Sequence, residues 1–181
     1  LTRIMTPPPV PAAWALALLV LAAAFFDLRS RTIPNWLTLG GILAGFAVNG
    51  LALGPAGLKT AGLGFLASLL FLIPFALGFL GGGDVKLMAA VGTMAGAANL
   101  LVIFVLDAIL GGVVGLAGIL IRGRFRRTLA NIGRIFRLLA QFKAPYKEDP
   151  ELEAGSASSF GMPRAVTIAT AVLLYLWGSR P

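Results

Sequence analysis

Cysteine and histidine are both absent from this 181-residue chain, and acidic residues are few. The absence of cysteine excludes disulfides and thiol nucleophiles, and the absence of histidine excludes Ser-His-Asp triads. The usual ligand sets of zinc sites are excluded for the same reason. Side-chain catalysis must therefore use hydroxyl groups or one of seven acids: Asp27, Asp84, Asp107, Glu148, Asp149, Glu151 and Glu153.

Charge is also scarce. Charged residues make up 12% of the sequence, about half the fraction in an ordinary soluble domain, whereas 58% of the residues are hydrophobic. Such a chain has too little polar surface to cover a water-facing globule, which argues against a soluble enzyme. The long apolar runs predict an all-α membrane protein, a polytopic bundle of about six transmembrane helices. We expect one domain, 1–181, with spans over residues 10–26, 36–53, 58–80, 85–98, 100–121 and 164–177.

The lysines and arginines are distributed unevenly about these spans. If residues 85–121 cross the membrane twice, twelve of the 15 basic residues lie on one side, within 27–35, 81–86 and 122–164. Cytoplasmic loops carry the excess of Lys and Arg, so we expect both termini to lie outside, on the side of the membrane away from the cytoplasm. The net charge of +8 therefore indicates orientation in a membrane rather than binding to nucleic acid.

The predicted cytoplasmic loop 122–162 contains a periodic pattern. Apolar residues recur every three or four positions, and basic residues fill the opposite face; the apolar set is Phe125, Leu129, Ile132, Phe136 and Leu139. This pattern predicts an amphipathic helix over 124–142 that lies in the membrane interface and binds anionic lipid headgroups. A docking surface for a protein partner is the alternative.

Glycines four residues apart permit helices to approach closely within a membrane. The chain contains three such pairs: Gly41/Gly45, Gly92/Gly96 and Gly111/Gly115. They favour a compact bundle and carry no information about chemistry.

Ionisable residues in membrane segments are costly and by default indicate function. Asp27 and Asp84 each lie at the cytoplasmic end of a predicted span, and therefore at the same depth on the same side. Two carboxylates that meet there would share a proton and could activate water at a peptide carbonyl. Each could instead be only a polar residue near a helix end. Asp107 lies within a span, where it could bond a neighbouring helix or lie on a proton path.

Five residues near the two acids are predicted to contribute to the site by shaping the backbone, by hydrogen bonding or by their charge. Gly81 and Gly83 belong to a run of three glycines before Asp84, where the backbone can turn freely and approach a substrate closely. Pro34 suits the first turn of a helix. Asn35 could cap backbone groups or orient Asp27. Lys86 could reach lipid headgroups or favour the charged form of the acid pair.

The predicted fourth span is short. Residues 85–98 would extend about 21 Å as a helix, against a hydrocarbon core of about 30 Å. Either this helix ends below the outer surface or the bilayer is thin there. We hypothesise that the shortfall helps water to reach Asp84.

These motifs resemble a known family. Gly81-Gly-Gly-Asp84-Val-Lys-Leu resembles the Gly-x-Gly-Asp motif of membrane aspartic proteases, and Asp27-Leu-Arg-Ser-Arg-Thr-Ile-Pro-Asn-Trp-Leu-Thr38 resembles the type IV prepilin peptidases. Presenilin-type proteases pair the first motif with Tyr-Asp, whereas Phe26 precedes Asp27 here. The resemblance covers about residues 10–121. The segment that opens the last predicted span, Ser159-Phe-Gly-Met-Pro-Arg-Ala, is similar to a family stretch with its order changed.

The resemblance implies a multi-pass endopeptidase of the bacterial inner membrane with its active site facing the cytoplasm. Such enzymes cut the basic leader of prepilins or pseudopilins where it meets the hydrophobic helix. By this comparison Asp27 and Asp84 are the catalytic pair and Gly81 and Gly83 the motif glycines, with neither a cofactor nor a metal. The short N-terminal region and the lack of Cys-x-x-Cys motifs resemble the peptidases of tight-adherence (Flp-type) pilus systems, so methyltransferase activity is not expected.

Two further interpretations stay open. A small proton-coupled transporter could use Asp27, Asp84 and Asp107 as a relay, and it would depend on Asp107. A non-catalytic membrane subunit of a secretion or pilus assembly system would depend on the basic helix 124–142 instead.

Overall fold

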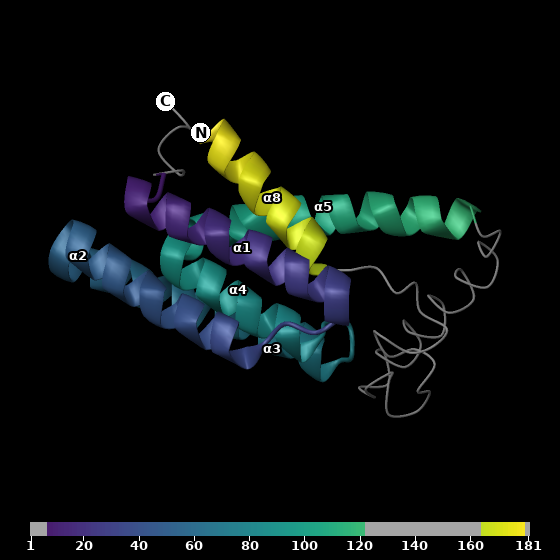
Figure 1. Cartoon of the computed structure of the whole chain (residues 1–181), viewed down its shortest axis with the longest axis horizontal. Coiled ribbons are helices and arrows are strands. Elements are labelled where there is room, and N and C mark those ends of the chain that lie inside the picture. The colour runs from purple at the N-terminus through teal and green to yellow at the C-terminus, as the bar shows by residue number, and fades with distance from the viewer. Residues whose placement is uncertain (1–6, 122–163, 180–181) are drawn as a thin grey trace.

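The computed structural model describes residues 7–121 and 164–179, and every regular element in these two ranges is helical. The elements are α1 (Val10–Ser30), α2 (Asn35–Ser68), the 3-10 helix η1 (Leu69–Phe71), α3 (Leu72–Ala76), α4 (Gly82–Ala95), α5 (Ala97–Ile121) and α8 (Arg164–Gly178). Figure 1 shows them packed as a bundle from which the far end of α5 projects. The predicted all-α class is confirmed for this part of the chain, whereas the predicted helix 124–142 and its loop 122–162 lie outside the described residues.

Several of these helices have the length and composition of membrane spans. Within the described residues, three segments are long and apolar enough to cross a membrane: α1, α5 and the segment from Asn35 to Ala76. The helices α4 and α8 are shorter, with 14 and 15 residues. The chain is therefore a membrane protein, while the count of about six spans stays a prediction.

The long helix α2 reverses direction at Gly54. This residue has non-helical angles (φ 60°, ψ −139°) and is followed by Pro55. The backbone at Gly57 lies against the carbonyl of Asn49, although residues eight positions apart would be about 12 Å apart along a continuous helix. The two arms of α2 therefore run side by side in opposite directions. The bend falls between the predicted spans 36–53 and 58–80.

Two predicted boundaries need correction. The first span was expected to end at residue 26 and lead into a polar loop, but α1 continues to Ser30 and contains Asp27. It ends where Arg31 adopts a left-handed conformation (φ 52°) and donates its N–H to the Asp27 carbonyl. The helical segment that corresponds to the predicted span 58–80 ends at Ala76, after α2 has passed into η1 and α3.

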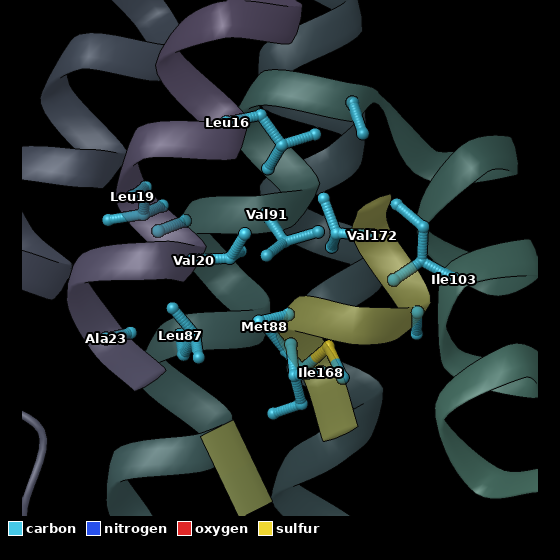
Figure 2. Close-up of a cluster of buried hydrophobic side chains, with 14 of the residues drawn as sticks. Leu16, Leu19, Val20, Ala23, Leu87, Met88, Val91, Ile103, Ile168 and Val172 are labelled. Atoms are coloured by element: carbon cyan, nitrogen blue, oxygen red, sulfur yellow. The ribbon is translucent and has the colours of Figure 1, made fainter. Parts of the chain in front are cut away.

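The short helix α4 lies at the centre of the bundle. Every residue from Leu87 to Ala95 is buried. Figure 2 shows side chains from α4 meeting those of α1, α5 and α8, among them Leu16, Leu87, Val91, Ile103 and Val172. The N-terminus of α4 is thereby held between the end of α1 and the start of α8.

The helix α4 ends at Ala95, because the next residue, Gly96, has a non-helical φ of 83°. The break lies in the region predicted to separate the fourth and fifth spans. A helix that ends inside an apolar bundle needs partners for its last carbonyls. The Asn49 amide of α2 supplies them, because its Nδ2 donates to the carbonyls of Thr93 (2.8 Å) and Met94 (3.2 Å).

Glycines bring the two arms of α2 against α4. A Cβ added to Gly45 would collide with Thr93, and one added to Gly64 would collide with the backbone of Gly92. Close packing of this kind is expected where small residues line a helix contact. Among the described residues, an added Cβ at Gly111 or Gly115 would meet nothing within 4 Å, so this third pair lies outside the helix contacts.

Two neighbouring glycines of α2 test this packing. Gly64→Ala places a methyl group against backbone that cannot move aside, so we expect a loss of about 1–3 kcal/mol in the free energy of unfolding in detergent. Gly62→Ala serves as the matched control, since its Cβ would meet nothing within 4 Å among the described residues. Equal stability of the two variants would contradict the close approach of α2 and α4.

Candidate active site

Asp84 lies in the first turn of α4, where it caps its own helix. Its Oδ2 accepts a hydrogen bond from the N–H of Gly81 at 3.3 Å. The first N–H groups of a helix have no partner within the helix, and an acidic side chain at the third position can reach back to one of them. The residue is only 8% exposed. The carboxyl group is therefore held at the buried start of α4.

Asp27 lies in the last turns of α1 and caps a different helix. Its Oδ2 accepts a hydrogen bond from the backbone N–H of Ala165 at 2.9 Å. Ala165 is the second residue of α8, so this N–H is one of those that the helix itself leaves unpaired. The side chain of Asp27 thus joins α1 to the N-terminus of α8.

Arg164 joins the same helix start to Asp84. Its Nη1 donates to the carbonyl oxygen of Phe79 at 2.8 Å, and its Nε lies 3.6 Å from Asp84 Oδ2. Consecutive residues of α8 therefore contact the two acids, Ala165 at Asp27 and Arg164 at Asp84. The carboxyl group of Asp84 lies within electrostatic range of that of Asp27. The first turn of α8 thus contacts both of the acids that the sequence predicted as a pair.

The third acid of the membrane segments, Asp107, lies on the same side of the bundle. It is 4% exposed, and Thr167 of α8 lies within hydrogen-bonding reach of its carboxyl group. Its charge interacts with that of Asp84 and with that of Arg164. The sequence left open a hydrogen bond to a neighbouring helix or a place on a proton path for Asp107, and Thr167 belongs to the neighbouring helix α8.

The other predicted site residues join elements around the acids. Pro34 precedes α2, and its carbonyl accepts the N–H groups of Leu37 and Thr38, as expected for a residue that begins a helix. Asn35 was expected to cap backbone groups or to orient Asp27. Its Oδ1 instead accepts a hydrogen bond of 2.8 Å from Nζ of Lys86.

The three glycines before Asp84 are half-buried, and two of them adjoin residues of the site or of the loop that follows α1. An added Cβ at Gly81 would lie 3.3 Å from the Asp84 carboxylate, and one at Gly83 would lie 3.5 Å from Ile33. Gly81 precedes α4 with an extended backbone (φ −75°, ψ 149°). Both predicted motif glycines therefore adjoin the acid or the loop that follows α1.

Arg164 and Ala165 were not predicted as site residues. Arg164 had been grouped with the basic residues that set orientation. One feature of the sequence could have identified Arg164. It is the single charged residue of the last helix, Arg164–Gly178, and it lies at the first position of that helix.

The arrangement is suited to acid–base chemistry. It comprises two interacting carboxyl groups, a guanidinium group and the N-terminus of α8. Across residues 7–121 and 164–179, no three His, Cys, Asp or Glu side chains gather closely enough to hold a metal ion.

Comparison with family models gives a match over residues 14–116 to the type IV leader peptidase family. This range covers more than half of the chain and includes both Asp27 and Asp84, while α8 lies beyond it. No curated protein and no solved structure matches the chain.

Cysteine substitution can test the placement of the glycine run. The Cβ atoms at positions 33 and 83 would lie 3.5 Å apart, within the range of a disulfide. We expect the double variant Ile33→Cys/Gly83→Cys to form an intramolecular disulfide on mild oxidation, detected by gel mobility. The chain has no cysteine of its own, so no other intramolecular disulfide can form.

The matched control for this experiment is Ile33→Cys/Gly111→Cys. A Cβ at Gly111 would meet no atom of the described residues within 4 Å. A disulfide in the control at the same rate, or none in the test pair, would contradict the packing of the loop after α1 against α4.

Proposed function

Because the chain belongs to the type IV leader peptidase family, we propose that it is an aspartic endopeptidase that removes the leaders of type IV prepilins or pseudopilins. The observation that carries this proposal is the contact of two consecutive residues, Arg164 and Ala165, with Asp84 and Asp27. The carboxyl groups of Asp27 in α1 and Asp84 in α4 therefore both lie at the N-terminus of α8. A pair of neighbouring carboxyl groups can supply both the base and the acid that activate water at a peptide bond.

In the proposed reaction one carboxylate accepts a proton from water while the water oxygen attacks the scissile carbonyl carbon. The protonated partner donates to the carbonyl oxygen, which gives a tetrahedral intermediate. This intermediate collapses with cleavage of the C–N bond, and the amine leaves with a proton returned from the pair. Asp27 and Asp84 suffice for these transfers, and the proposal includes no cofactor or metal.

The proposed site faces the cytoplasm of a bacterial cell, at the inner membrane. The basic residues Arg29 and Arg31 lie two and four positions after Asp27, and Lys86 lies two positions after Asp84. Since cytoplasmic loops carry the positive charge, this end of the bundle belongs at the inner leaflet, and both termini belong outside. A prepilin places the junction between its basic leader and its apolar helix at the same depth.

In this proposal, residues 1–181 belong to one membrane-embedded peptidase domain. Gly81 and Gly83 let the substrate backbone pass close to Asp84, and the Lys86–Asn35 hydrogen bond fixes the start of α2 beside them. Anionic lipid, not nucleic acid, is the partner of residues 124–142.

A proton-coupled transporter is the second candidate, and one observation favours it. Asp107 is buried and interacts with the charge of Asp84, so the acids could pass protons along the bundle. The transporter requires Asp107, whereas the peptidase does not include it in the reaction.

The test of the peptidase is cleavage of a prepilin-like peptide by the purified protein in lipid. We expect Asp27→Asn and Asp84→Asn each to lower kcat at least about 100-fold, because an amide neither accepts nor donates the required proton. Both variants should insert into the membrane in normal amounts. Cleavage that persists in either variant would exclude a mechanism that needs both acids.

Asp107→Asn is the matched control for this experiment. The amide has nearly the size of the carboxyl group and still hydrogen-bonds to Thr167, so we expect a loss of less than about tenfold in kcat. A loss as large as that in the Asp84 variant, together with proton uptake by vesicles that contain the wild-type protein, would favour the transporter instead.

A further inference from the structure

We propose that Arg164 is a positioning residue of the active site, which holds the Asp84 carboxyl group in place beside Asp27. This inference rests on the proposed function. It starts from two contacts of the arginine, one with the connection that precedes α4 and one with the first turn of α4. The Nη1 atom binds the Phe79 carbonyl, and the Nε atom lies 3.6 Å from Asp84 Oδ2.

Phe79 belongs to the short connection between α3 and α4. This connection has no helical structure, and it includes Gly78 with a φ of 78°. It leads directly into Gly81, whose N–H is the other partner of Asp84 Oδ2. The Asp84 carboxyl group is therefore fixed by Gly81, which precedes its own helix, and by Arg164 of α8. The arginine also holds the connection that carries Gly81.

The geometry of the guanidinium group explains why position 164 is suited to an arginine. Its planar fork presents several N–H groups in fixed directions, so one side chain can bind a carbonyl oxygen and approach a carboxylate together. A lysine would supply the charge from a single flexible ammonium group. Arg164 also interacts with the charge of Asp107, so one cation faces two of the three acids at this end of the bundle.

The same helix start holds the second acid through its backbone. The N–H of Ala165 donates to Asp27 Oδ2 at 2.9 Å. A change in the direction of the α8 N-terminus would therefore move the partners of both acids at once. This coupling gives the first turn of α8 a role in the geometry of the pair, beyond the packing of the helix.

The packing of α8 does not depend on the arginine head. The helix is held by buried apolar residues, among them Ala165, Ile168 and Val172, whereas the Arg164 side chain is 39% exposed. Substitution at position 164 should therefore leave α8 docked. An effect on the reaction can then be separated from an effect on folding.

The experiment compares Arg164→Gln and Arg164→Lys with the wild type in the prepilin cleavage assay. We expect Arg164→Gln to lower kcat about tenfold or more, since hydrogen bonds to charged groups have effects of this size, with KM changed less than about twofold. Arg164→Lys keeps the charge without the fork and should fall between the other two. Melting temperatures in detergent should agree among the three proteins.

Lys59→Gln controls for the loss of one positive charge. Lys59 is exposed on the second arm of α2, and it should keep wild-type kcat. Wild-type kcat in Arg164→Gln, a rise in its kcat, or a defect confined to KM would each overturn the positioning role. If the wild type itself fails to cleave, the proposed function fails, whereas normal cleavage by both Arg164 variants refutes the inference about Arg164 alone.

Discussion

The structure depends on one constraint, that polar groups at helix ends need partners where water is scarce. In a bilayer the unpaired N–H and C=O groups of a helix terminus are too costly to leave without hydrogen bonds. Three helix ends meet this constraint through side chains. Asp84 binds the N–H that precedes α4, Asp27 binds the N–H of Ala165 at the start of α8, and Asn49 binds carbonyls at the end of α4.

This constraint also explains how the candidate catalytic acids are positioned. A carboxyl group that caps a helix has its direction set by the backbone it binds, so Asp27 and Asp84 are oriented before any substrate arrives. The capping partners lie on neighbouring helices and turns, which brings acids from distant parts of the sequence to one place. Capping and catalysis are therefore compatible roles of the same side chains. Arg164 adds the only positive side chain that the described structure records as an ion-pair partner of Asp84.

The central helix α4 connects this site to the rest of the bundle. It is buried along most of its length and packs closely against α2 through Gly45, Gly64 and Gly92. Because the helix has only 14 residues, its two ends are both close to the bundle interior. Its start carries Asp84, and its end is satisfied by Asn49. The tight packing of α4 therefore also fixes the position of Asp84 at its start.

By itself the sequence determined the class of fold and the identity of the acids. Long apolar runs can be stable only as membrane helices, and the lack of His and Cys left Asp27 and Asp84 as the main candidates for hydrolysis. The short fourth helix and the break at Gly96 followed from the length of the apolar runs. These features are local, because they depend on composition and on the spacing of residues along the chain.

Only the tertiary structure decided the partners of those residues. Asp27 was expected in a loop but lies in α1, because the left-handed turn at Arg31 ends the helix later than the apolar run does. Asn35 binds Lys86, and Arg164 and Ala165 bind the two acids across the bundle. No spacing along the chain encodes such contacts. They arise because the packing of helices brings side chains and helix ends from distant segments within hydrogen-bonding distance.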